Sequence, residues 1–104
     1  MYGVIRRYEG VDEARMDEIL DRARGELVPR LAEAPGFEAY YLLRAGRGVI
    51  ASFGVFDDEA GAETSNEIAK KFIRESGMSE AMPKAPEITG GEITAQKVLQ
   101  ATTA

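Results

Sequence analysis

The stretch GFEAYYLLRAGRGVIASFGVF, residues 36–56, decides the fold. It contains two apolar runs, Phe37–Leu43 and Val49–Phe56, on either side of the short glycine-containing turn Ala45–Gly48. Aromatic and β-branched residues in the runs, with glycine where the backbone must reverse, are typical of a β-hairpin. Both faces of this hairpin are apolar, and the second run has no charged residue. Because a hairpin with one face in water alternates apolar with polar residues, we expect both faces to be covered.

Strict alternation assigns the side chains of the first run to two faces. It places Tyr41 on one face together with Phe37, Ala39 and Leu43, and we expect the helices to cover that face. Tyr40 then points to the opposite face, where we expect a second copy of the chain, since tyrosine is enriched at protein interfaces.

The segments before the hairpin predict one strand and one interrupted helix. Tyr2–Glu9 alternates as a strand, and Asp12 is a suitable N-cap for the helix that follows. We expect this helix to break near Gly25 and to resume as a short second piece with Pro29 in its first turn, where proline is tolerated. Its apolar face recurs at spacings of three and four, at Met16, Ile19, Leu20, Ala23 and Leu27.

The segments after the hairpin predict a second helix and a last strand. Asp57 or Asp58 caps the helix, and Gly77 is suited to end it. Glu87–Leu99 is predicted to be a strand, with a bulge or bend at its two adjacent glycines. The residues from about 100 to 104 are expected to fray.

The predicted order is therefore β-α-β-β-α-β, which gives an α+β, ferredoxin-like fold with an antiparallel four-stranded sheet in a single domain spanning residues 1–104. Both helices would cover one face of the sheet. A second copy would cover the other face, so the predicted assembly is a homodimer that forms a dimeric α+β barrel.

The composition excludes several classes of function. The net charge of −5, without a basic stripe, argues against a nucleic-acid partner. The absence of cysteine excludes disulfides and zinc–thiolate sites, and the absence of histidine removes the commonest general base and metal ligand. No carboxylate spacing suits a hard cation, so no metal site is predicted. With neither a signal-peptide pattern nor an apolar run long enough for a membrane span, we expect a cytoplasmic protein without a membrane partner.

The chain resembles the antibiotic biosynthesis monooxygenase-like family of dimeric α+β barrels. The resemblance runs from Tyr2 to about Leu99. It rests on Pro35-Gly36-Phe37 with Tyr40-Tyr41, on Ser52–Phe56 followed at once by Asp57–Ala60, and on Glu63–Ala69 and Pro86–Val98.

The resemblance implies a homodimer with a cavity between sheet and helices in each subunit. Some members oxidise quinols or anthrone-type aromatics with O2, without metal or flavin, and others degrade haem. Because the chain has no histidine to serve as the usual proximal haem ligand, we expect no cofactor. The implied ligand is a small aromatic molecule.

Two residues are candidates for a catalytic role. Asn66 lies at the edge of the apolar face of the second helix, and the resemblance implies that it holds a substrate oxygen or a water; the alternative is a boundary residue facing solvent. Tyr41 could place a phenol in the cavity, or it could be a half-buried aromatic with its hydroxyl at the rim.

Four further residues are candidates for substrate binding. Arg7 could bind a carboxylate or phenolate, although pairing with Glu38 or Glu92 is the alternative. Ser52 could orient a ligand or simply fill a tight position in the sheet. Phe53 and Phe72 would shape the cavity if they are not purely core residues.

Two functions remain open at this point. One is a cofactor-free monooxygenase that acts on a small aromatic or quinol-like substrate. The other is a non-catalytic dimeric protein that binds a small molecule or serves as an accessory module. A third idea is a barrel of this fold that binds a protein partner. Fold alone does not decide among them, because one fold hosts many functions.

Overall fold

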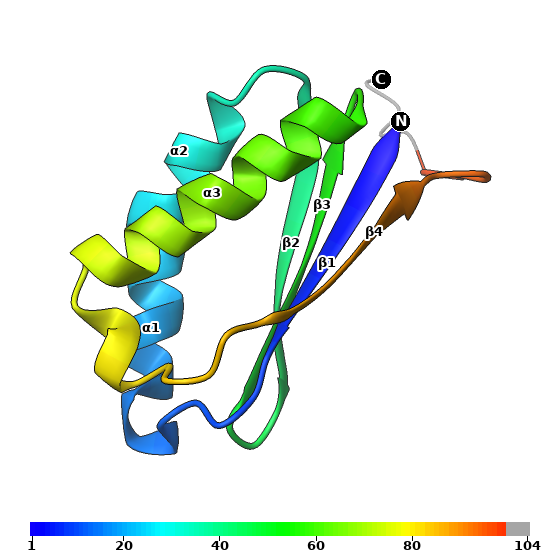
Figure 1. Ribbon diagram of the computed structural model, residues 1–104. Coiled ribbons are helices and arrows are strands. Elements are labelled where there is room, and N and C mark those ends of the chain that lie inside the picture. The colour runs from blue at the N-terminus through cyan, green and yellow to red at the C-terminus, as the bar shows by residue number, and fades with distance from the viewer. Residues whose placement is uncertain (100–104) are drawn as a thin grey trace, which may run out of the picture.

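The computed structural model describes residues 1–99 and shows an antiparallel four-stranded sheet with helices on one face (Figure 1). The strand order is β2-β3-β1-β4, and each neighbouring pair is antiparallel. The predicted ferredoxin-like β-α-β-β-α-β order is confirmed. The elements are β1 (Tyr2–Tyr8), α1 (Met16–Arg22), α2 (Val28–Ala32), β2 (Phe37–Gly46), β3 (Val49–Phe56), α3 (Glu59–Glu75) and β4 (Glu87–Glu92).

The first helical segment is continuous, where a break was predicted. Asp12 caps it as expected, because its carboxylate accepts a hydrogen bond from the Ala14 amide at 3.0 Å. Between α1 and α2 the chain forms a π-helical turn, Ala23–Leu27, and this turn holds Gly25. The helix therefore continues through Gly25 with one wider turn in place of a break. Pro29 lies in the first turn of α2, as predicted.

The second helix, α3, begins and ends where the sequence indicated. The Asp58 carboxylate accepts a hydrogen bond from the Gly61 amide at 3.0 Å, which satisfies one of the free donors of the first turn. Gly77 follows the helix with φ +78°, a left-handed conformation that glycine adopts without strain. The buried side of α3 packs on the sheet beside α2 through Ala69 and Phe72.

A bulge near the start of β2 reverses the faces predicted for the side chains that follow it on this strand. Phe37 pairs with Phe56 and Ala39 with Val55, so Glu38 is an extra residue on its strand. Because side chains alternate along a strand, one inserted residue moves every later side chain to the other face. Tyr40 therefore faces the helices and Tyr41 the open side. The predicted positions of both tyrosines were wrong for this reason.

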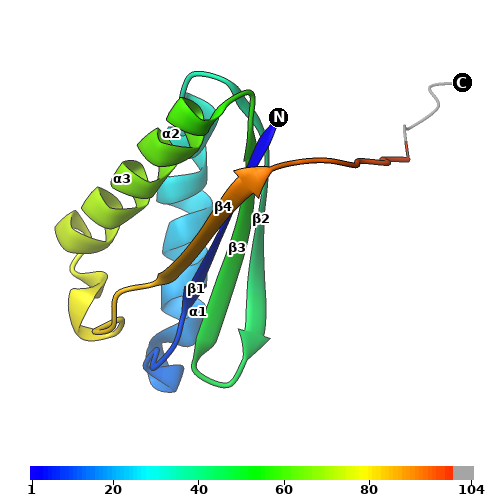
Figure 2. The same ribbon diagram turned by 45° about the vertical axis from the view of Figure 1, so that its right-hand side comes forward.

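No helix covers the other face of the sheet in the single chain (Figure 2). Tyr41 is 58% exposed, Leu43 50% and Ile5 45%. Tyr41 stacks on half-buried Phe53 with ring centroids 6.5 Å apart. The prediction that both faces of the hairpin are apolar is confirmed.

The last strand is shorter than predicted. β4 ends at Glu92, and residues 93–99 continue without regular structure. The register between β1 and β4 runs without a shift through Gly90 and Gly91, so the bulge predicted there is absent. The Tyr2 ring lies over Gly90, where an added Cβ would come within 3.1 Å of it. The tail predicted to fray lies outside the described residues.

Candidate functional site

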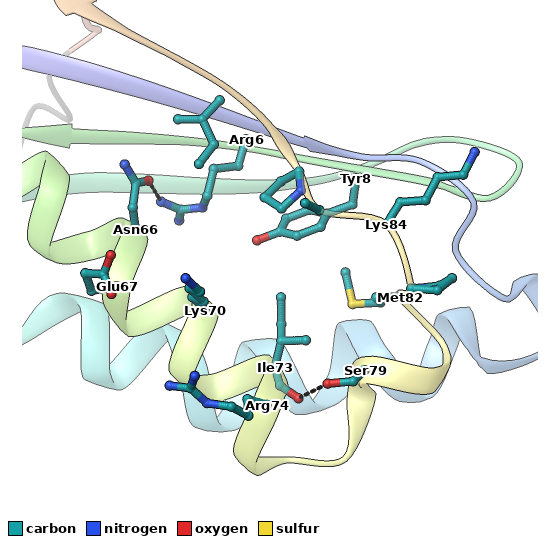
Figure 3. A pocket seen from close by; sticks show the side chains of 14 residues that line it. Arg6, Tyr8, Asn66, Glu67, Lys70, Ile73, Arg74, Ser79, Met82 and Lys84 are labelled. Carbon is teal, nitrogen blue, oxygen red and sulfur yellow. Dashed lines mark hydrogen bonds between the residues drawn. The ribbon is translucent and has the colours of Figure 1, made fainter.

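A pocket of about 550 Å³ opens between α3, the β1–β4 edge of the sheet and the segment that connects α3 to β4 (Figure 3). Its size is within the range of small-molecule sites. The lining comes from β1 (Arg6, Tyr8), α3 (Asn66, Glu67, Lys70, Ile73, Arg74), the connecting segment (Ser79, Met82, Pro83, Lys84, Ala85, Pro86) and β4 (Ile88).

The connecting segment is packed firmly enough to serve as a wall. Met78 and Met82 are buried in the same apolar cluster as Tyr8 and Ile19. The Ala81 carbonyl accepts a hydrogen bond from the Asp12 amide at 2.8 Å. The segment is thus held against the start of the first helix, so this wall of the pocket is fixed by the packing of the fold.

The floor of the pocket is formed by Arg6, the largest fully buried side chain, which is only 2% exposed. Its Nη1 donates to Asn66 Oδ1 at 2.8 Å and to Ser65 Oγ at 3.2 Å. Its guanidinium carbon lies 6.0 Å from the centre of the Tyr40 ring. Among residues 1–99, no carboxylate lies within 4 Å of this guanidinium. A charge without a counter-charge is costly to bury, so Arg6 calls for an explanation.

Two polar side chains point to the same region as Arg6 (Figure 3). Asn66 uses its carbonyl oxygen to accept from Arg6, which leaves its NH2 group able to donate. Burial raises the pKa of the Tyr8 hydroxyl above its usual value, and the charge of Arg6 only partly opposes that shift. Tyr8 therefore stays protonated near neutral pH and can donate a hydrogen bond.

A second, smaller cavity of about 30 Å³ lies deeper, between the sheet and the helices. Arg6 and Tyr8 line both cavities, and Phe72 and Ser52 line the inner one. Ser52 is 2% exposed, and its hydroxyl has no hydrogen-bond partner within the described chain. An unpaired buried hydroxyl is unusual, and it places a polar group beside Arg6 in the lining of the inner cavity.

The larger pocket is basic although the chain is acidic. Its lining has four basic residues and one acidic residue, Glu67, in a chain of net charge −5. Lys70 and Arg74 lie one turn apart on the same side of α3. Lys84 lies over Gly10, with its ammonium directed away from the pocket (Figure 3). Such a lining favours an anionic ligand.

The structure separates the residues that the sequence singled out. Asn66 lies in the pocket, and Ser52 and Phe72 lie at the inner cavity. Tyr41 and Phe53 lie on the open face of the sheet, away from both cavities, so their predicted place in the cavity was wrong.

Arg7 was a candidate for substrate binding, and its predicted place in the cavity was also wrong. Its side chain is exposed, and it pairs with Glu9 at 3.0 Å rather than with Glu38 or Glu92. The inward arginine is its neighbour Arg6. Sequence reasoning did not single out Arg6 or Tyr8, although one signal was available. Arg6 alternates with Val4 and Tyr8 on one side of β1, and a charge between apolar residues of a buried face needs a reason.

Residues 1–99 contain neither a metal-binding cluster nor a membrane-spanning helix. No group of three or more acidic side chains there could hold a metal ion. No helix there is long and apolar enough to cross a membrane.

Comparison with known proteins identifies the fold. No protein-family model and no curated protein sequence matches the chain. Among solved structures, a protein of unknown function from Nitrosomonas europaea is 23% identical, with TM-score 0.72 over 96% of this chain and 95% of that one. A Streptomyces coelicolor monooxygenase in complex with nanaomycin D is 13% identical, with TM-score 0.62 over 97% and 92%.

Other matches carry the same fold. An antibiotic biosynthesis monooxygenase is 17% identical, with TM-score 0.70 over 91% of this chain and 100% of that one. A dimeric ferredoxin-like protein from an uncultured marine organism is 14% identical, with TM-score 0.68 over 95% and 92%. The chain therefore has the fold of the antibiotic biosynthesis monooxygenases, as its sequence predicted.

Proposed function

We propose that the chain is a cofactor-free monooxygenase that binds a small phenolic aromatic in the pocket and oxidises it with O2. The observation that carries the proposal is the buried guanidinium of Arg6, which has no counter-charge in the described chain. A phenolate would supply that charge. Both hydrogen bonds of Arg6 come from Nη1, so the hydrogens on Nε and Nη2 can point to a ligand oxygen.

The proposed chemistry needs little from the protein. Arg6, with the Tyr8 hydroxyl and the Asn66 NH2 group as further donors, lowers the pKa of a bound phenol, and its proton leaves to solvent. The electron-rich anion then reacts with O2. With an anthrone, the CH2 carbon loses two hydrogens and gains one oxygen atom, and the second oxygen atom leaves as water. The substrate is oxidised by the O2 that is reduced. Ser52 would meet the ligand at its inner end.

Oxygen uptake with dithranol, a dihydroxyanthrone, tests the proposal. We expect the protein to accelerate uptake above the spontaneous rate, with one O2 consumed for each quinone formed. Arg6→Met and Asn66→Ala should lose this acceleration, and Arg24→Met, a change at a surface ion pair outside the pocket lining, should keep it. Full activity in both pocket variants would remove Arg6 and Asn66 from the reaction.

A binding protein without catalysis is the second candidate. It is favoured because the pocket lining that residues 1–99 form lacks a suitable general base. The phenol of its lining, Tyr8, has a raised pKa, and the carboxylate of its lining, Glu67, is exposed at the rim. Neither is suited to take a proton from a deeply bound substrate near neutral pH. Saturable binding of aromatic anions without any acceleration of oxygen uptake would support this function.

We also propose that a second copy covers the open face of the sheet. Ile5, Tyr41 and Leu43 form an exposed apolar group there, and such groups mark interaction sites. One structural neighbour is described as dimeric. Size-exclusion chromatography with light scattering should give twice the chain mass of 11.3 kDa. Leu43→Lys should give a monomer, since it places a charge among the exposed apolar side chains of that face. A wild-type monomer would contradict the proposal.

A further inference from the structure

Two basic residues of the pocket are not explained by a phenolate at Arg6. Lys70 and Arg74 line the outer part of the pocket, and within the described chain neither has a carboxylate within 4 Å. Lys71, which follows Lys70 on the same helix, is outside the lining and pairs with Glu75 at 3.8 Å. The two pocket residues thus differ from their neighbour in both position and pairing.

We propose that the ligand carries a carboxylate that binds Lys70 and Arg74 while its phenolic oxygen binds Arg6. This inference rests on the proposed function, because it concerns the same pocket. The charge at the rim fits one carboxylate: two cations and the carboxylate of Glu67 leave one net positive charge. A phosphate dianion would exceed that charge. The apolar residues Ile73, Met82 and Ile88 lie in the same lining and suit an aromatic body between the two ends.

A matched pair of dyes tests the carboxylate directly. Rhein is a dihydroxyanthraquinone with one carboxylate, and aloe-emodin is the same molecule with a hydroxymethyl group in its place. Each partly solvated ion pair contributes roughly two- to fivefold in affinity. We therefore expect isothermal titration calorimetry to show rhein binding about tenfold more tightly than aloe-emodin, with a smaller ratio at high salt.

Variants assign the effect to the two residues. Lys70→Gln should weaken rhein binding by roughly two- to fivefold and leave aloe-emodin unchanged. The double variant Lys70→Gln/Arg74→Gln should bring the ratio close to one. Lys71→Gln is the control and should keep the wild-type ratio. All three side chains are exposed, so the variants should fold.

The outcomes separate this inference from the proposed function. Equal binding of both dyes to the wild-type protein would overturn the proposal that the pocket binds a carboxylate, but not the proposal that it binds an aromatic ligand. A preference for rhein that survives in the double variant would also overturn it, because the carboxylate would then be bound elsewhere. Binding of neither dye would overturn the pocket proposal and this inference together.

Discussion

Replacing Arg6 with methionine should change binding much more than stability. The guanidinium donates two hydrogen bonds from a charged group, worth about 1.5–3 kcal/mol each, and contacts the Tyr40 ring, worth about 0.5–2 kcal/mol. Against these gains stands the loss of hydration of a buried charge, which costs several kcal/mol. The two contributions are of similar size. A methionine of similar length would keep the apolar packing.

Neither acceptor is stranded by this substitution. Ser65 keeps the hydrogen bond that its hydroxyl donates to the Ala62 carbonyl at 2.6 Å, and half-buried Asn66 faces the pocket, where water can reach it. We therefore expect the unfolding free energy of Arg6→Met to lie within about 1 kcal/mol of wild type. Rhein affinity should fall by about ten- to a hundredfold, the value of one lost hydrogen bond to a charged group.

Urea unfolding followed by circular dichroism measures the first quantity, at one fixed protein concentration because a dimer gains stability with concentration. Calorimetric titration with rhein measures the second. Arg24→Met, at an exposed pair with Asp21, should change neither. If Arg6→Met lost about 3 kcal/mol or more, Arg6 would be a structural residue, and the argument from its missing counter-charge would fail.

Three further predictions concern the scaffold. Gly61→Ala should destabilise the fold by about 1–3 kcal/mol in urea unfolding, because the added Cβ would lie 2.9 Å from a backbone carbonyl oxygen. Gly25→Ala has open space around it and should stabilise the fold by about 0.5–1 kcal/mol. Equal effects of the two substitutions would refute the packing argument. Asp58→Ala should cost about 1 kcal/mol through loss of the α3 cap, and an unchanged midpoint would contradict that role. Asp57 raises the pKa of the Glu38 carboxyl by hydrogen bonding and by charge repulsion. The contribution of Glu38 to the free energy of unfolding is therefore present below the usual glutamate pKa of 4.5, and it is lost as the pH rises through the raised pKa of the folded state. Glu38→Gln should match wild type in melting temperature at about pH 4 and exceed it at about pH 7, and a constant difference across this range would refute the coupling.

The sequence sufficed for the order of elements and for the caps of the helices. Hydrophobic period, glycine positions and the aspartates Asp12 and Asp58 are local signals, and local signals determine where helices and strands begin. The apolar character of both hairpin faces was likewise visible. These features are confirmed.

The face of each β2 side chain could not be predicted, because one inserted residue decides it. The residues around Glu38 do not show whether it is regularly paired or lies in a bulge, because the register depends on how β2 pairs with β3. The error moved Tyr41 and Tyr40 to each other's places. Phe53, the pairing partner of Tyr41 on β3, lies with it on the open face.

The pocket was only half predictable. Asn66 could be placed because a helix has a fixed period and its apolar face was clear. The hydrogen-bond partner of Asn66 on β1, Arg6, is 60 residues away in sequence. Arg6 and Arg7 are also the same residue type, so residue type alone does not distinguish them. Alternation places the two arginines on opposite faces of β1, and Arg6 is buried because it shares its face with the core residues Val4 and Tyr8.

A crystal structure of the protein with bound rhein tests the central claim most directly. We predict that the dye lies between α3 and β1, with a phenolic oxygen about 3 Å from the Arg6 guanidinium and the carboxylate toward Lys70. A dye bound on the open face of the sheet, with Arg6 making only its contacts to Ser65 and Asn66, would contradict the claim that the buried arginine is there to bind an anion.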